Sequence, residues 1–218
     1  MSHFSVAVFT ENGDLEQVDK LLAPFQENNM GDCPREYLAF TEDEDCDVDE
    51  ETGKRGYWEN PNAKWDWYVV GGRFTGMLIA RRGKTGEQGV PGVFGRRPEA
   101  GSFDSMKVED IDFAAMRVRA RKNLAPFESC WDRKFYKPEY FQKRYPDEET
   151  YVRAKTEFST YACITPDGEW HAPGRMGWFG VDDADPKAKI SFQDVYMERF
   201  IKPAIENGWY MTIVDCHI

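Results

Sequence analysis

The sequence predicts an α+β fold, with a mainly antiparallel sheet, helices packed on one face, paired terminal strands and long irregular loops. Three observations support this class: strand-like and helix-like segments alternate, turn sequences join neighbouring strand segments as hairpins, and hydrophobic residues make up 41% of the chain. The 218 residues suit one globular domain, 1–218, with an acidic loop at 41–56 and a glycine-rich irregular insertion at 83–103.

The first elements follow from local signals near the N-terminus. Residues 3–9 are mostly apolar and β-prone, and the turn pair Asn12-Gly13 ends this predicted strand. Asp14 is a suitable N-cap for a short helix that Pro24 stops. The apolar residues of that helix recur at helical spacing: Leu15, Val18, Leu21 and Leu22.

The middle of the chain has mixed signals. Residues 67–80 are rich in aromatic and β-branched residues around Gly71-Gly72, which predicts a hairpin or a bulged strand pair. Residues 83–101 contain six glycines and two prolines and should form an irregular excursion. A helix is expected over 109–122, and a shorter one should start at 146–147.

The last third gives the clearest pattern. Residues 158–164 predict a strand, 166–168 a turn and 169–171 the start of the returning strand. Ser191 and Asp194 form a capping-box-like helix start, Gly208 is a natural helix stop, and 209–217 predict the final strand.

Charge is distributed unevenly along the chain. The net charge is −11, yet residues 42–51 alone hold eight carboxylates, and residues 117–144 hold nine basic side chains against three acidic ones. The acidic balance argues against non-specific nucleic-acid binding, whereas a local basic surface can hold a small anion. We therefore expect a small anionic molecule, or a host protein, as the partner.

Cysteine usage and hydropathy indicate the compartment. Five cysteines without regular spacing do not suggest a secreted disulfide framework. The N-terminal residues do not resemble a signal peptide, and no apolar run approaches 18 residues. The prediction is a soluble, cytosolic protein without a membrane partner.

The first candidate site lies at 60–74. Trp65, Asp66 and Trp67 precede Gly71-Gly72 and Arg73, and this pattern fits a ligand platform in which the indoles stack on a planar ring while Arg73 binds an anion. The glycine pair would let backbone come close to a partner. The alternative is a hairpin whose tryptophans fill the core and whose Asp66 and Arg73 pair or cap a turn.

A second candidate site is the loop at 168–180. Its four glycines stand among His171, Arg175 and Trp178, which is typical of a shaped binding loop with exposed amides. His171 has a side chain suited to general acid or base work. The alternative is a loop that only covers the core.

The C-terminal residues form a third candidate site. Asp215 and His217 share one face of the predicted last strand, and Cys216 points to the other face. A carboxylate that orients an imidazole is a common pairing, and His3 would join it if the terminal strands pair. No zinc-type spacing is present, so we predict no metal ligands, although binding of a metal by His3 and His217 is left open.

Several strings, spread along nearly the whole chain, resemble a family of uncharacterised proteins from tailed bacteriophages and prophages. They include MSHF, LAPFQEN, NPNAKWDWY with GGRF, DIDF with MR, WFG and TIVDCHI, at residues 1–4, 22–28, 60–74, 110–117, 178–180 and 212–218. The resemblance implies an accessory protein acting in the bacterial cytoplasm, in counter-defence or host takeover. It implies no reaction, cofactor or catalytic residue.

Three functional hypotheses follow. The first is binding of a small nucleotide-like anion in a pocket framed by residues 65–73 and 171–178. The second is a hydrolase or transferase of the same pocket, with His171 or His217 as general base and Asp66 or Asp215 orienting it. The third is an interaction protein that blocks a host factor through its acidic segment.

Overall fold

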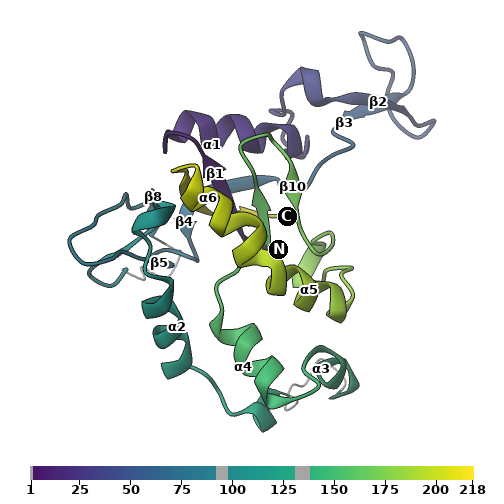
Figure 1. The fold of residues 1–218 in the computed structure, drawn as a ribbon. Coiled ribbons are helices and arrows are strands. Elements are labelled where there is room, and N and C mark those ends of the chain that lie inside the picture. The colour runs from purple at the N-terminus through teal and green to yellow at the C-terminus, as the bar shows by residue number, and fades with distance from the viewer. Residues whose placement is uncertain (1, 92–97, 131–137) are drawn as a thin grey trace.

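A central mixed sheet organises the molecule. The computed structural model describes residues 2–91, 98–130 and 138–218 (Figure 1). The strand order is β10-β9-β1-β11-β4-β6, and β8 pairs with the other end of β11. The strands are β1 (His3–Thr10), β4 (Trp67–Gly72), β6 (Val90–Pro91), β8 (Ser105–Lys107), β9 (Ala162–Ile164), β10 (Trp170–His171) and β11 (Tyr210–His217). The predicted α+β class with a mainly antiparallel sheet is confirmed.

The terminal strands pair at the centre of this sheet, as expected. β1 runs antiparallel to β11 over its full length, from His3 opposite His217 to Thr10 opposite Tyr210. β11 also pairs antiparallel with β4 and β8, and β9 lies parallel to β1. The two chain ends therefore lie side by side (Figure 1).

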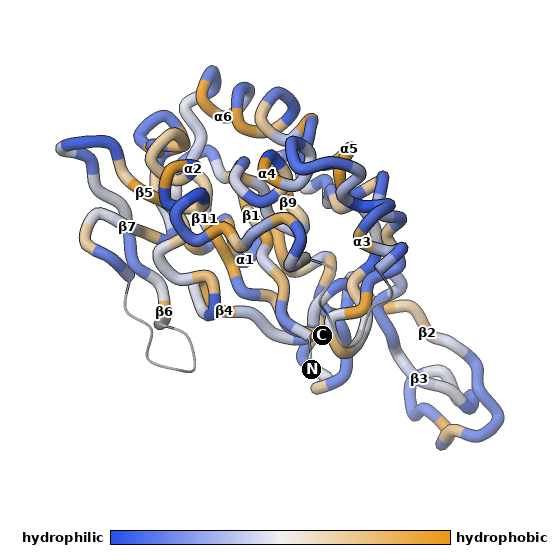
Figure 2. Tube along the Cα trace, turned by 90° about the horizontal axis from the view of Figure 1, so that it is seen from below, coloured by the Kyte–Doolittle hydropathy of each residue, from blue (hydrophilic) through white to orange (hydrophobic). Residues whose placement is uncertain are grey.

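Helices cover both faces of the sheet, most of them on one face. Ala7 and Ile213 point toward α2 (Phe113–Lys122), α5 (Pro186–Tyr196), the turn Met197–Ile201 and α6 (Lys202–Glu206). Val6 and Val214 point to the opposite face, where α1 (Leu15–Leu22) and Trp65 complete a second apolar cluster. Figure 2 shows the apolar colour concentrated on the central strands between these layers. Alternating side chains of β1 and β11 thus supply two cores at once.

Several locally encoded elements form as predicted. Asp14 caps α1 by accepting from the N–H of Glu16, and Asp147 caps α4 (Glu148–Thr156) by accepting from Thr150. β9 and β10 form the expected hairpin. Gly208 has a φ of +68°, the left-handed conformation that ends a helix before β11.

The segment around the glycine pair differs from the predicted hairpin. β4 ends at Gly72, and β5 (Leu78–Ile79) pairs instead with β7 (Ser102–Phe103) in a separate two-stranded sheet. Gly71 and Gly72 have φ values of +79° and +53°, so the chain leaves the sheet at this point. Residues other than glycine rarely adopt this backbone conformation. The hairpin prediction, made from composition, did not take these positive φ values into account.

Two helix starts also differ from the prediction. α5 begins at Pro186, where Asp185 caps it by accepting from the N–H of Lys187, so Ser191 lies inside the helix rather than at its start. α2 begins at Phe113 after a short 3₁₀ turn, Val108–Asp110. Both expected starts placed a favourable local pattern at the wrong residue.

The predicted acidic loop at 41–56 lies within a hairpin. β2 (Ala39–Glu42) and β3 (Gly56–Glu59) pair antiparallel and project from the body of the molecule (Figures 1 and 2).

Elsewhere in the structure, α3 (Pro138–Arg144) and α4 share a small aromatic cluster. Part of the expected insertion, 92–97, lies outside the described residues. Among the helices described, none has the length and apolar character needed to span a membrane.

Candidate functional site

Three rings from three strands cluster at one end of the sheet. The register places His3 of β1 opposite His217 of β11, and His217 opposite Trp67 of β4. The rings of His217 and Trp67 stack, with centroids 4.8 Å apart and an interplanar angle of 19°. The His3 ring meets the His217 ring edge-on at 5.0 Å. Strand pairing therefore brings together His3 and His217, which are 214 positions apart in the sequence.

Each histidine in this cluster is held by a carboxylate. Asp215 Oδ1 lies 2.9 Å from His3 Nδ1, and Asp215 Oδ2 accepts from the backbone N–H of Arg73 at 2.8 Å. Asp66 Oδ1 lies 2.6 Å from His217 Nδ1 and also accepts from the backbone N–H of Trp67. Because a carboxylate only accepts, each neutral ring carries its proton on Nδ1 and leaves a lone pair on Nε2.

The two histidines are largely shielded from water. The side chains of His217 and His3 expose 3% and 9% of their surface, whereas Trp67 exposes 42%. His217 Nε2 is buried and has no hydrogen-bond partner among the described residues. Within the same residues, no group of three or more His, Cys, Asp or Glu side chains is arranged to hold a metal ion.

The structure brings together four of the candidate residues, Asp66, Trp67, Asp215 and His217. It places the side chains of Trp65, Arg73, His171 and Arg175 elsewhere. Trp65 is 5% exposed, and its indole N–H donates to the carbonyl of Leu22, so its ring lies in the core. The Arg73 side chain is exposed and lines a separate cavity of about 300 Å³ beside Arg119.

His171 lies on β10, at the opposite edge of the sheet from β4. Its Nε2 is 3.1 Å from the Thr165 hydroxyl, and burial, with the nearby Arg199 guanidinium, lowers its pKa below the usual value. The Arg175 side chain is exposed, and its backbone N–H donates to Asp183. The side chain of Trp178 lies outside the described part of the structure. The loop at 171–178 thus meets the first candidate segment through apolar packing, with Met176 in the same cluster as Trp65.

Comparisons with known proteins supply no precedent for these groups. No family model, curated protein or solved structure matches the chain. The resemblance to phage accessory proteins stays a prediction, and the physical basis for a function lies in the side-chain clusters and cavities.

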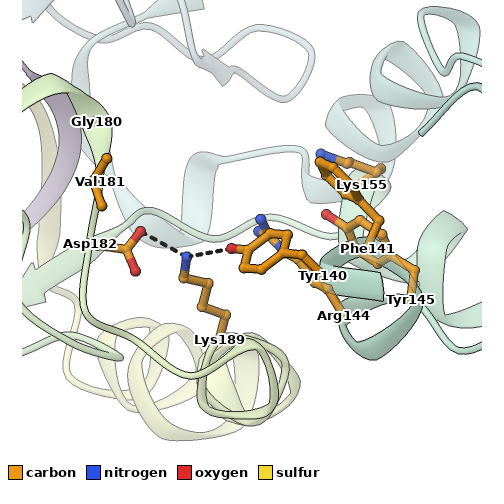
Figure 3. Close-up of a pocket in the computed structure, with 9 residues that line it drawn as sticks. All are labelled: Tyr140, Phe141, Arg144, Tyr145, Lys155, Gly180, Val181, Asp182 and Lys189. Atoms are coloured by element: carbon orange, nitrogen blue, oxygen red, sulfur yellow. Dashed lines mark hydrogen bonds and ion pairs between the residues drawn. The ribbon is translucent and has the colours of Figure 1, made fainter. Parts of the chain in front are cut away.

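The sequence did not single out a cavity that lies between α3, α5 and residues 180–182 (Figure 3). Its volume is about 320 Å³. Lys189 of α5 reaches across it, with its Nζ 2.8 Å from Asp182 Oδ2 and 3.2 Å from the Tyr140 hydroxyl. Asp182 and Lys189 are both largely buried, so this ion pair is a fixed part of the wall.

Cations and aromatic rings alternate around the rest of that wall. The Arg144 guanidinium lies 5.2 Å from the Tyr145 ring centre and Lys155 Nζ lies 5.6 Å from it, while Lys189 Nζ is 5.9 Å from the Tyr140 ring. Each distance is within cation–π range. Of these three cations, Arg144 alone lies in the basic stretch 117–144 noted in the sequence, and α3 itself was not predicted.

Proposed function

We propose that the protein binds a small, planar, nucleotide-like anion in the cavity between α3 and α5. One observation carries the proposal: Arg144, Lys155 and Lys189 face one cavity, and Asp182 is the single carboxylate among its described lining residues. Cationic side chains at the cavity wall favour an anion, in a chain whose net charge is −11.

The side-chain types suit both halves of such a ligand. A guanidinium such as that of Arg144 offers paired N–H donors in the plane that a phosphate prefers. Tyr140 and Tyr145 line the cavity, and aromatic side chains are the residue type on which a planar base stacks. A volume of about 320 Å³ lies at the lower end of the range for small-molecule sites, about 300–1,000 Å³.

The test is calorimetric titration with nucleoside mono- and diphosphates and, separately, with inorganic pyrophosphate. Arg144→Gln should weaken all of these ligands by about 10- to 100-fold, since a hydrogen bond to a charged group contributes about 1.5–3 kcal/mol. Tyr140→Leu should weaken the nucleotides and leave pyrophosphate binding nearly unchanged, because pyrophosphate has no ring to stack.

Arg121→Gln is the matched control, because Arg121 is an exposed arginine of α2 that lines a different cavity. Its binding should equal that of the unmodified chain. The proposal is overturned if no nucleotide binds at millimolar concentration, or if Arg121→Gln and Arg144→Gln weaken binding equally.

The other two hypotheses stay predictions. A hydrolase or transferase would draw on the contact between Asp66 and His217, at 2.6 Å, but its second candidate base, His171, belongs to a different strand at the far edge of the sheet. A host-factor blocker would use the acidic arm formed by β2 and β3. Sequestration of a signalling nucleotide would suit the accessory role that the phage resemblance implies.

A further inference from the structure

His3 and His217, here called the paired histidines, have no part in the proposed anion site. Each has its Nδ1 within hydrogen-bond distance of a carboxylate, and in the neutral ring this contact leaves the lone pair on Nε2. This arrangement, in which a carboxylate accepts from one ring nitrogen and leaves the other as an electron-pair donor, is the usual environment of a metal-binding histidine.

The burial of His217 Nε2 is the second observation. A buried acceptor without a donor costs about 1–3 kcal/mol, and such groups are rare unless a water, an ion or a function accounts for them. His217 Nε2 has no hydrogen-bond partner among the described residues, while Asp66 fixes the ring through Nδ1. The lone pair is therefore available and is held in place.

The separation of the two rings is also suitable. A cation held by both Nε2 atoms at about 2.0–2.1 Å would lie roughly 3 Å from each ring centre. Two ring centroids 5.0 Å apart are close enough to share one cation, since the two cation-to-centre distances add to about 6 Å. The small exposed part of His3 gives the pair a side that solvent reaches.

We propose that the paired histidines bind one divalent cation of the zinc, nickel or copper type through both Nε2 atoms. Asp215 and Asp66 orient the rings and do not themselves bind the cation, because their contacts are to the Nδ1 atoms and backbone amides. Imidazole donors select these metals over magnesium and calcium, which prefer oxygen. Because the structure offers two protein ligands here, water completes the coordination and the site is weaker than a structural zinc site.

The sequence provides its own control, since the chain has three histidines and His171 is the one outside the pair. Protein treated with a chelator and then freed of it is titrated with zinc, nickel or cobalt chloride by calorimetry. The unmodified chain and His171→Ala should each bind one cation. His3→Ala should bind at least about tenfold more weakly, since even loss of an orienting partner costs about 10- to 100-fold.

His217 is buried, so His217→Ala can fail to fold; the imidazole nitrogen shifts of the unmodified chain provide a second measurement. Zinc should move the Nε2 resonances of His3 and His217 and leave those of His171 in place. The proposal is overturned if no cation binds at millimolar concentration or if His3→Ala binds as tightly as the unmodified chain. Loss of binding after alkylation of the thiols, with no effect of His3→Ala, would assign the cation to cysteine and also overturn it.

Discussion

Two buried carboxylates fix the turn that follows β4. Asp215 lies against Gly72 and accepts from the backbone N–H of Arg73. Asp104, fully buried, lies against Gly71 and accepts from the hydroxyl of Thr75 and the N–H groups of Gly76 and Gly89. A buried carboxylate needs such donors to offset its desolvation. The turn and the His3 contact thus share Asp215.

Substitution of Gly72 tests this arrangement. A Cβ at Gly72 would lie 2.5 Å from Asp215 Cβ and 2.8 Å from Val69 Cγ2, at a φ of +53°. We expect Gly72→Ala to lower the free energy of unfolding by about 2–4 kcal/mol, from the left-handed backbone and the overpacking together. Urea denaturation followed by circular dichroism measures the loss.

Gly168→Ala separates the two contributions. Gly168 has a φ of +85°, but a Cβ there meets no atom within 4 Å in the described structure. Its cost should be confined to the backbone, about 1–2 kcal/mol. Equal losses for the two variants would show that the approach to Asp215 does not matter.

The glycine pair shows how far a local pattern can be interpreted. Two glycines before an arginine correctly predict that backbone comes close to a partner. The partners are Asp215 and Asp104, which come from distant parts of the sequence, and no property of residues 67–74 identifies them. The sequence therefore predicted the close approach but not the groups that make it.

At the scale of elements, the arm of β2 and β3 has its own small set of contacts. The Arg35 guanidinium lies 3.2 Å from the Trp58 ring centre, and the Trp58 indole N–H donates to Asp49 at 3.0 Å. The Phe40 ring packs against Trp58 at 5.1 Å. These contacts order a segment whose eight clustered carboxylates repel one another.

Removal of the Trp58 ring should therefore open the arm alone. In Trp58→Ala, amide hydrogen exchange over 39–59 should accelerate by at least about tenfold, while the amides of β11 keep their protection, because opening of the arm is local. Tyr57→Ala is the control, since Tyr57 is exposed on the same strand. Faster exchange in β11 would contradict this picture of an independent arm.

Helix boundaries depend on the same balance of local and distant effects. Asp14 and Asp147 were identifiable N-caps because side-chain caps act within three residues. Ser191 has an equally favourable pattern but lies inside α5, because Asp185 and Pro186 start the helix earlier.

At the scale of the whole molecule, β11 is the central element. It pairs with β1, β4 and β8, and its side chains enter both apolar clusters. Contacts between the first and last strands therefore hold the two ends of the chain together. They include the hydrogen bond from the Ser2 amide to the Ile218 carbonyl at 2.9 Å. Such non-local pairing slows folding.

Ile213 reports on this strand. It is fully buried on the face covered by α2, α5 and α6. Ile213→Ala should cost about 2–5 kcal/mol of unfolding free energy, because it leaves a cavity in a packed core. Ile205→Ala, at a position 38% exposed, should cost less than about 1 kcal/mol. Thermal or urea unfolding of the two variants measures both losses. Similar losses of unfolding free energy would be inconsistent with a core centred on β11.

By itself, the sequence determined the α+β class, the terminal strands and the capped helices, because hydrophobic periodicity and N-caps act over a few residues. Strand alternation also predicted that Asp215 and His217 lie on one face, and in the structure they do. Only the tertiary structure decided that Asp66 holds His217, that Asp215 holds His3 and that α3 meets α5 around a cationic cavity. These contacts join segments far apart in the chain, and their geometry depends on strand register and helix packing, which no local pattern specifies.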